Sequence, residues 1–258
     1  MNNTFNDLRF GKLFRKHTIE NYRKYLMSLG VLGGSLVLFY SFMITIGGNK
    51  SIALETQMIA FFFFYIGGGV IFTSSIFSDP GNPRESIAAL ILPASHFEKF
   101  LVAWLYSFLI YSGIFLLLFY AIDFSFVHAS TQKNKALLDI FDKEKEYYII
   151  FPIYAVLHAF ALYGAVFFKK MHFIKTACLF FLLLVITTVF HKQLVQLLIP
   201  KSLYVGQPLG GLQLLDGDNY FLISLEQETK KFYAIVLFAG CTLTLWAGAY
   251  FQLKEKQI

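Results

Sequence analysis

Charged residues are scarce in this chain of 258 residues: Asp, Glu, Lys and Arg make up 15% of it, against about 25% in a typical soluble domain. Hydrophobic residues make up 57%, and 31 residues are phenylalanine. A soluble fold of this size could not cover so much apolar surface. The composition therefore excludes a soluble enzyme, a disordered linker and a small secreted disulfide domain. It indicates a protein that crosses a membrane several times.

Motifs that carry chemistry are also missing. The two cysteines, Cys178 and Cys241, lie in apolar runs, and we interpret them as small hydrophobic residues. The six histidines are scattered without an H-E-x-x-H motif, and no G-x-S-x-G is present. Asn49 follows Gly47 and Gly48 where a phosphate-binding loop requires glycine. We therefore expect no catalytic, metal-binding or cofactor-binding residues, and hence no enzyme activity, on this chain.

Six stretches without charged residues fit the length of a membrane crossing, which takes about 20 apolar residues in a helix. The fifth is short, and we expect it to extend past a flanking charge or to be completed by the segment after it. The predicted fold is all-α, a polytopic membrane protein with six transmembrane helices. The expected spans are residues 25–49, 56–78, 100–122, 147–168, 176–191 and 232–253.

The basic residues predict the orientation of the chain. With the N-terminus in the cytoplasm, the inner segments carry every arginine and more than half of the 22 basic residues, in agreement with the positive-inside rule. This distribution explains the net charge of +6 and makes binding to nucleic acid an unnecessary hypothesis. We expect a transmembrane domain at 25–253, a cytoplasmic tail at 254–258 and both termini in the cytoplasm.

Residues 1–24 alternate basic and apolar side chains. We expect them to form a helix that lies on the inner membrane surface, with an ordinary basic flank of the first span as the alternative. The basic side chains that would reach lipid headgroups are Lys12, Arg15, Lys16, Arg23 and Lys24.

Two outer segments have unusual patterns. Leu137, Leu138 and Phe141 recur at helical spacing, which predicts a short amphipathic helix between residues 124 and 146. Residues 191–231 are apolar but are interrupted by proline and glycine. This pattern predicts a broken segment that partly re-enters the membrane between spans five and six, where protein or water must cover its backbone.

The loop between the second and third spans is the most structured polar segment. Asn82 can cap a helix that begins at Pro83, and Ser95 with Glu98 forms an S-x-x-E capping box that opens the third span. We interpret the short helix 84–92 as a docking element, with a plain connector as the alternative. Its expected docking residues are Arg84, Glu85, Ile87, Leu90 and Leu92.

Two ionisable residues lie within or next to the spans. His158 is well inside a span and so is a candidate for the transport pathway, although packing is the simpler interpretation because a neutral imidazole is inexpensive to bury. Asp123 closes the third span, and we expect it at the outer interface. Gly30 and Gly34 form a G-x-x-x-G pattern that favours close helix contacts.

These features together resemble the ABC-2-type permease subunits of ATP-binding-cassette exporters, also called the type V exporter fold. An interfacial helix precedes six spans, and a short cytoplasmic helix joins spans two and three. The Leu-Pro-Ala-Ser at 92–95, followed by Glu-Lys-Phe at 98–100, is similar to such permeases from the Bacteroidota.

The resemblance implies a non-catalytic permease in the bacterial inner membrane. Residues 84–92 would be the coupling helix seated in a separate ATPase subunit, present in two copies that bind ATP and Mg²⁺, and residues 10–25 would be the connecting helix. A homodimer, or a heterodimer with a second permease, would export an amphipathic or lipid-like substrate. The alternatives are an ion-coupled secondary transporter that uses Asp123 or His158, and a structural membrane anchor.

Overall fold

The computed structural model describes residues 5–47, 52–76, 95–129, 136–142, 145–168, 171–198, 203–205, 212–216, 219–223 and 226–256. Within these ranges, six helical segments are long and apolar enough to cross a membrane. The predicted fold class, an all-α polytopic membrane protein, is therefore confirmed for the spans. Each of the six helical segments contains the central part of one predicted span.

The helical elements make up the six spans in chain order. The third span consists of three consecutive pieces, because a π-helix, η2, interrupts it. The fourth begins with a 3₁₀ turn, η3. The helical elements are α1 (Asp7–Gly47), α2 (Leu54–Ile76), α4 (His96–Trp104), η2 (Leu105–Ile110), α5 (Tyr111–Ala129), η3 (Tyr147–Ile149), α6 (Ile150–Phe167), α7 (His172–Leu198) and α8 (Gln227–Lys256).

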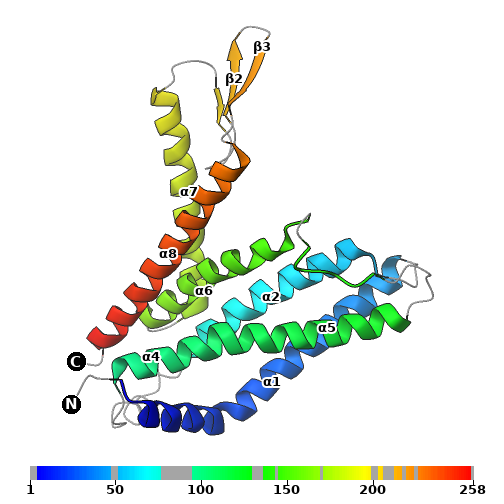
Figure 1. Ribbon diagram of the computed structural model, residues 1–258, viewed down its shortest axis with the longest axis vertical. Helices are drawn as coiled ribbons and strands as arrows, with labels where there is room; N and C mark the ends of the chain where they lie inside the picture. Colours follow the sequence, from blue (N-terminus) through cyan, green and yellow to red (C-terminus); the bar gives the residue numbers. More distant parts are fainter. Residues whose placement is uncertain are drawn as a thin grey trace.

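Successive spans run in opposite directions, so the two ends of the chain lie at the same end of the bundle (Figure 1). α6 is the central helix, because α2, α7 and α8 all pack against it. α7 is the most exposed span, with 6% of its most apolar window buried inside the protein, compared with 50% for α6. Most of the surface of α7, including Cys178, therefore lies on the outside of the bundle.

α1 is a single helix of 41 residues, so no helix boundary separates the expected N-terminal segment, 1–24, from the first span. Nothing between Glu20 and Ser28 would end a helix, because this stretch has neither glycine nor proline. The helix changes direction instead (Figure 1). The first part of α1 thus lies across the end of the bundle, and the remainder continues as a span.

The fifth span is longer than its charge-free core. α7 covers 27 residues and includes both Lys175 and Lys192, so it extends past the flanking charges as expected for this short stretch. Lysine is a good helix former with a long apolar stem, and it can place its ammonium group at the membrane surface while the helix continues.

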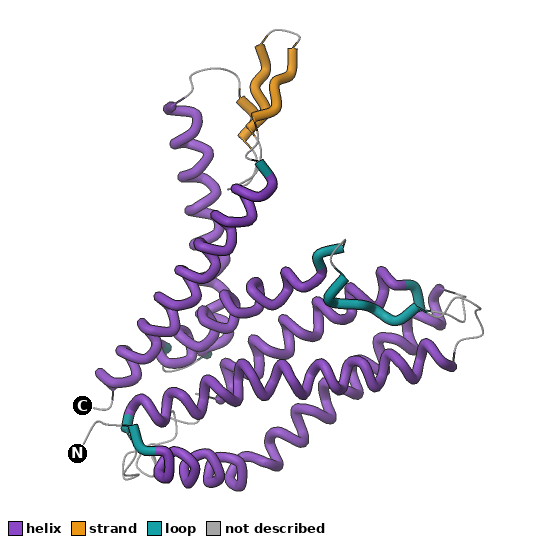
Figure 2. Tube along the Cα trace, viewed as in Figure 1, coloured by secondary structure: helices purple, strands orange, loops and turns teal. Residues whose placement is uncertain are grey.

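The broken segment expected between the fifth and sixth spans contains strands, which the sequence pattern did not predict. β1 (Leu203–Val205), β2 (Leu212–Asp216) and β3 (Asn219–Ile223) make a three-stranded antiparallel sheet in the order β1-β2-β3. Leu203 pairs with Leu214, which pairs in turn with Phe221. Figure 2 shows the strands beyond the far ends of α7 and α8. An open sheet edge is not tolerated in hydrocarbon, so this sheet argues against re-entry.

The expected amphipathic helix around residues 137–141 was wrong. The described residues of this segment, 136–142, are irregular and carry one turn. Leu138 and Ile140 are buried, whereas Leu137 and Phe141 are exposed. Alternate residues therefore point inward, as in an extended chain, and this chain covers the outer end of the bundle.

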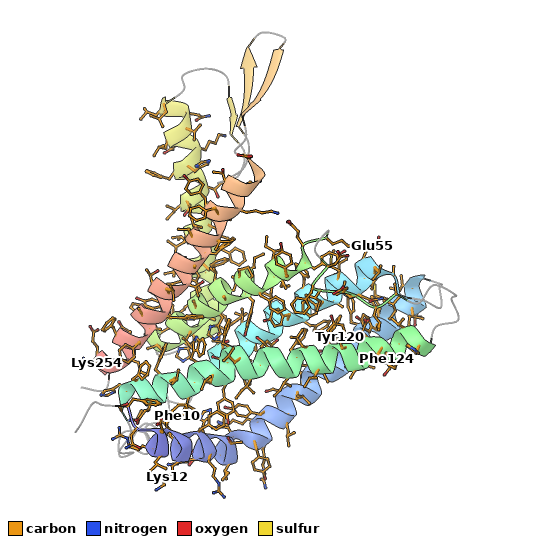
Figure 3. All side chains as sticks on the ribbon, in the orientation of Figure 1. Phe10, Lys12, Glu55, Tyr120, Phe124 and Lys254 are labelled. Carbon is orange, nitrogen blue, oxygen red and sulfur yellow. The ribbon has the colours of Figure 1, made fainter. Side chains whose placement is uncertain are left out.

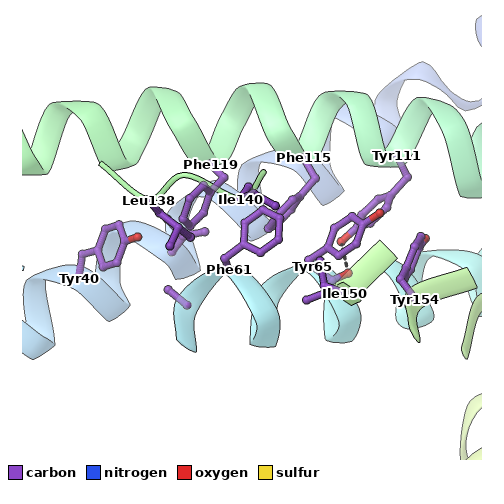
Figure 4. Close-up of a cluster of buried hydrophobic side chains, with 12 residues drawn as sticks. Tyr40, Phe61, Tyr65, Tyr111, Phe115, Phe119, Leu138, Ile140, Ile150 and Tyr154 are labelled. Atoms are coloured by element: carbon purple, nitrogen blue, oxygen red, sulfur yellow. Dashed lines mark hydrogen bonds between the residues drawn. The ribbon is translucent and has the colours of Figure 1, made fainter. Parts of the chain in front are cut away.

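Aromatic side chains make up most of the main cluster of buried residues. Phe61 and Tyr65 of α2 face Phe115 and Phe119 of α5, with ring centroids 5.0 Å apart for Phe61 and Phe119 and 5.2 Å apart for Tyr65 and Phe115 (Figure 4). On each helix the rings are four residues apart and so lie on one face. The two helices are antiparallel, and this aromatic ladder fixes their register.

Glycine permits the closest helix approach in this core. A Cβ atom at Gly69 would collide with the rings of Tyr111 and Tyr154. Gly30 and Gly34, in contrast, have no atom within 4 Å of a hypothetical Cβ. The G-x-x-x-G pattern therefore makes no close helix contact among the described residues. Gly33, between them, faces Leu118 instead.

Candidate functional site

The predicted docking helix falls in the sequence between α2 and α4. Its residues Arg84, Glu85, Ile87, Leu90 and Leu92, with the cap Asn82, lie outside the described residues, so this helix stays a prediction. Its attachment points are described: α2 ends at Ile76, and α4 has Ser95 as its N-cap. Both points lie at the end of the bundle that the first part of α1 crosses (Figure 1).

The capping box that opens the third span is confirmed. The Glu98 amide donates to Ser95 Oγ at 3.2 Å, and the Ser95 amide donates to Glu98 Oε2 at 2.9 Å. The two bonds satisfy amides that the first turn of α4 leaves without partners. The carboxylate also lies at the positive end of the helix dipole.

The second oxygen of Glu98 holds the start of α1. Arg9 donates to Oε1 from Nε at 3.2 Å and from Nη2 at 2.9 Å, and the Asn6 amide donates to the same atom at 3.0 Å. Glu98 has no exposed surface. One buried carboxylate therefore caps α4 and anchors the N-terminal part of α1. Arg9 was not among the expected site residues, and nothing local in the sequence indicates a partner 89 residues away.

Tyr106 of η2 provides a second anchor for α1. Its ring packs against Phe14 at 4.9 Å and against His17 at 4.8 Å, and it stacks on Tyr25 at 5.3 Å. Its hydroxyl also forms a hydrogen bond with Thr18. The first part of α1 is therefore held along its length to the third span.

Most of the expected headgroup-binding residues are exposed on the other side of α1. Figure 3 shows Lys12 on the side of the helix that faces away from the bundle. Lys16 lies 3.6 Å from Glu20, one helical turn further along. Lys12, Arg15, Arg23 and Lys24 are exposed, and Lys16 is half-buried. This arrangement fits a helix that lies on a membrane surface.

His158 is completely buried in α6 and has both ring nitrogens hydrogen-bonded. Trp246 Nε1 donates to His158 Nδ1 at 3.1 Å, and His158 Nε2 lies 2.8 Å from Ser107 Oγ. Because an indole N–H only donates, Nδ1 must be the acceptor, and Nε2 carries the hydrogen. The Ser107 hydroxyl therefore accepts a hydrogen bond from His158 Nε2 and donates one to the Ala103 carbonyl at 2.8 Å.

This chain of hydrogen bonds decides the chemistry of His158. A serine is activated as a nucleophile when an imidazole nitrogen accepts its proton, whereas here the imidazole donates to Ser107. The arrangement is therefore a structural link between α6, η2 and α8. The π-helix contributes to it, because Tyr154 donates to the Ser107 carbonyl at 2.9 Å. This outcome supports packing as the role of His158.

Asp123 is completely buried within the protein, and its expected place at the outer interface stays a prediction. Tyr40 of α1 donates its hydroxyl to Asp123 Oδ1 at 3.0 Å. Among the described residues, neither Asp123 Oδ2 nor Gln57 Oε1 has a hydrogen-bond partner, and both atoms are buried. Gln57 precedes Phe61 by one turn and Asp123 follows Phe119 by one turn, so the aromatic ladder brings both side chains to one level of the bundle. A buried oxygen that accepts no hydrogen bond lowers the stability of the folded protein.

The described part of the chain contains no candidate metal site. No group of three or more His, Cys, Asp or Glu side chains gathers there in a way that could hold a metal ion.

Comparisons with known proteins find no matching family model, no similar curated protein and no similar solved structure. The functional argument therefore depends on the residues and geometry of this chain.

Proposed function

We propose that this chain is the permease subunit of an ATP-driven exporter of the ABC-2 type. A separate ATPase subunit would bind and hydrolyse ATP with Mg²⁺, and this chain would form the membrane path for an amphipathic or lipid-like substrate. Six membrane-spanning helices and the local sequence around Ser95 and Glu98 support this proposal. Neither the path nor ATP hydrolysis requires a catalytic residue on this chain.

The observation that carries the proposal is the double role of Glu98. A movement of residues 84–92 would reach α4 through the capping box, and the same carboxylate would pass it to α1 through Arg9. A docking helix is effective only if it is rigidly connected to the spans that it moves. The contacts of Tyr106 with α1 strengthen this connection.

One six-helix chain is a packed bundle, so enclosing a path would take two copies or this chain with a second permease. We expect two ATPase subunits to bind at the end of the bundle that carries both termini. That end would face the cytoplasm, and the small sheet would face the other side of a bacterial inner membrane. The basic residues of α1 support this orientation.

The test is purification of the tagged protein from its native membrane in mild detergent, followed by mass spectrometry of the proteins that co-purify. A stoichiometric ATPase supports the proposal. A homo-oligomer without an ATPase contradicts it. The Arg9→Ala variant adds a second measurement, because we expect it to retain the ATPase while substrate-dependent ATP hydrolysis falls.

A second candidate, an ion-coupled secondary transporter, is favoured by one observation. Asp123 is a buried acid with an unpartnered oxygen, and such residues in spans often serve ion or proton transport. This candidate predicts that Asp123→Asn abolishes ion-driven flux. The exporter predicts that the same variant retains ATP-driven transport.

A further inference from the structure

A groove lies between α6 and α8, beside η3. Its volume is about 430 Å³, which is within the usual range of about 300–1,000 Å³ for small-molecule sites. It is open on one side and lies between two helices that each cross the membrane. Its lining residues are Glu146, Tyr148, Ile149, Pro152, Ala155, Lys231, Ala234, Ile235, Phe238, Ala239, Thr242, Leu243 and Trp246.

The interior of this groove is apolar. Ala155, Ala234 and Ala239 create the hollow because their side chains are small. The hydroxyl of Thr242 donates to the Phe238 carbonyl at 2.7 Å and so is already satisfied within α8. An apolar hollow without free polar partners does not hold ordered water and binds apolar molecules instead.

The outer end of the groove is polar. Glu146 Oε1 and Lys231 Nζ form an ion pair at 2.6 Å, and both side chains are partly exposed. Glu146 stands at the cap of η3 with a φ of 52°, a left-handed conformation that is uncommon for a residue with a side chain. Trp246 closes the other end, where its indole is held by His158.

The length of the groove fits a lipid chain. Lys231 and Trp246 are separated by about 22 Å along α8, at about 1.5 Å per residue. Half of the hydrocarbon core of a bilayer is about 15 Å thick. The groove is longer than the hydrocarbon depth of one leaflet, so a hydrocarbon chain with its polar end at the ion pair could lie within it along its whole length.

We propose that this groove binds one hydrocarbon chain of a zwitterionic amphipathic molecule. Its anionic group would face Lys231, and its cationic group would face Glu146. A purely anionic headgroup would meet the carboxylate of Glu146 and a purely cationic one the ammonium of Lys231, so the pair favours a headgroup that carries both charges. The molecule is either a bilayer lipid or the exported substrate; the second source rests on the proposed function, and the first does not.

The experiment uses purified protein in vesicles of phosphatidylethanolamine and phosphatidylglycerol. A trace of either phospholipid carries a photoreactive group in its acyl chain, and mass spectrometry maps the adducts after illumination. We expect adducts on residues 149–155 and 234–246, with phosphatidylethanolamine labelling more strongly. Adducts spread evenly over the exposed faces of α7 and α8 would overturn the proposal, as would stronger labelling by phosphatidylglycerol.

Variants that fill the groove provide the matched comparison. Ala155→Leu and Ala239→Leu, made singly and together, should each fold, because leucine favours helices. We expect the double variant to reduce labelling about tenfold, which corresponds to about 1.4 kcal/mol of binding free energy. Leu237→Phe adds volume on an exposed side of α8 outside the groove and should leave labelling unchanged. Unreduced labelling in the double variant would overturn the proposal.

Two further measurements distinguish a transported substrate from a resident lipid, and test the groove independently of the proposed function. Labelling that ATP turnover changes, in the complex with the co-purified ATPase, supports the groove and assigns the ligand as substrate. Labelling that ATP leaves unchanged supports the groove and assigns a resident lipid. Loss of the groove leaves the ATPase co-purification untouched, and failure to find an ATPase leaves the adduct map of the purified chain untouched.

Discussion

Trp246 of α8 and His158 of α6 are joined by a hydrogen bond of 3.1 Å from indole Nε1 to imidazole Nδ1. The bond fixes the tautomer of His158 and directs its remaining hydrogen to Ser107 in η2. One imidazole therefore connects the third, fourth and sixth spans. Such polar links matter in a membrane, where lipid and helix surfaces are equally apolar and hydrophobic burial does little to hold helices together.

The first prediction concerns this link. We expect Trp246→Phe to lower the free energy of unfolding by about 1 kcal/mol, because it removes the donor to Nδ1 and hydrogen bonds between membrane helices are worth about this much. Thermal unfolding in detergent measures the change. The control is the same substitution in a His158→Phe background, where the effect should be much smaller. An equal loss in both backgrounds would show that the indole acts by packing alone.

The spans were predictable because their signal is local. A run of about 20 apolar residues specifies a crossing wherever it occurs, and the S-x-x-E pattern at Ser95 predicted a cap within one turn of the chain. The limits of the fifth span were less certain, because a rule based on charge cannot tell how far lysine stems extend along a helix.

Contacts between distant residues explain what the sequence did not predict. Arg9 and Glu98 are 89 residues apart, and Asp123 is buried because Tyr40, 83 residues away, offers it a hydroxyl. Near residue 138, helical spacing and alternation both fit a few apolar residues. The extended conformation there buries Leu138 and Ile140 in the same cluster as residues of α2 and α5. These contacts with distant residues decide between the two conformations.

The second prediction separates the charge of Asp123 from its hydrogen bond. Asp123→Asn keeps an oxygen that can accept from Tyr40 and supplies an N–H where the carboxylate has an unpartnered oxygen. We expect this variant to be at least as stable as the native protein, because replacing a buried charge without loss of packing is often neutral or favourable. Asp123→Ala leaves the Tyr40 hydroxyl without an acceptor and should cost about 1–3 kcal/mol. Thermal unfolding of both variants in detergent decides the matter, and a destabilised asparagine variant would contradict this account.

The third prediction concerns the anchor between Arg9 and Glu98. Arg9→Ala removes two hydrogen-bond donors from a buried carboxylate. A hydrogen bond to a charged group contributes about 1.5–3 kcal/mol to stability. We expect hydrogen–deuterium exchange to rise across residues 7–24, because this part of α1 loses its attachment, whereas the spans keep their protection. Ser95→Ala is the matched control, since it removes the cap of α4 and leaves the bonds from Arg9. Equal exchange in both variants would mean that the cap alone holds the segment.

The fourth prediction tests the orientation. A cysteine placed at Lys12 should react with a membrane-impermeant maleimide only after the cytoplasmic side is opened, because the basic face of α1 is expected there. A cysteine at Phe141, which is 65% exposed at the other end of the bundle, should react in intact cells. Cys178 and Cys241 are replaced by alanine in both proteins. The reverse pattern of labelling would invert the proposed topology.

The fifth prediction tests docking by residues 84–92. The double variant Ile87→Asp and Leu90→Asp should insert normally but lose the ATPase, because two charges would have to be buried without partners at the interface. Leu137→Asp with Phe141→Asp makes the same chemical change on exposed residues at the opposite end and should keep the ATPase. Co-purification measures association, and size-exclusion chromatography confirms insertion and folding. Normal transport by the first variant with its ATPase still bound would rule out residues 84–92 as the docking element, and Glu98 would then have no movement to pass to α1.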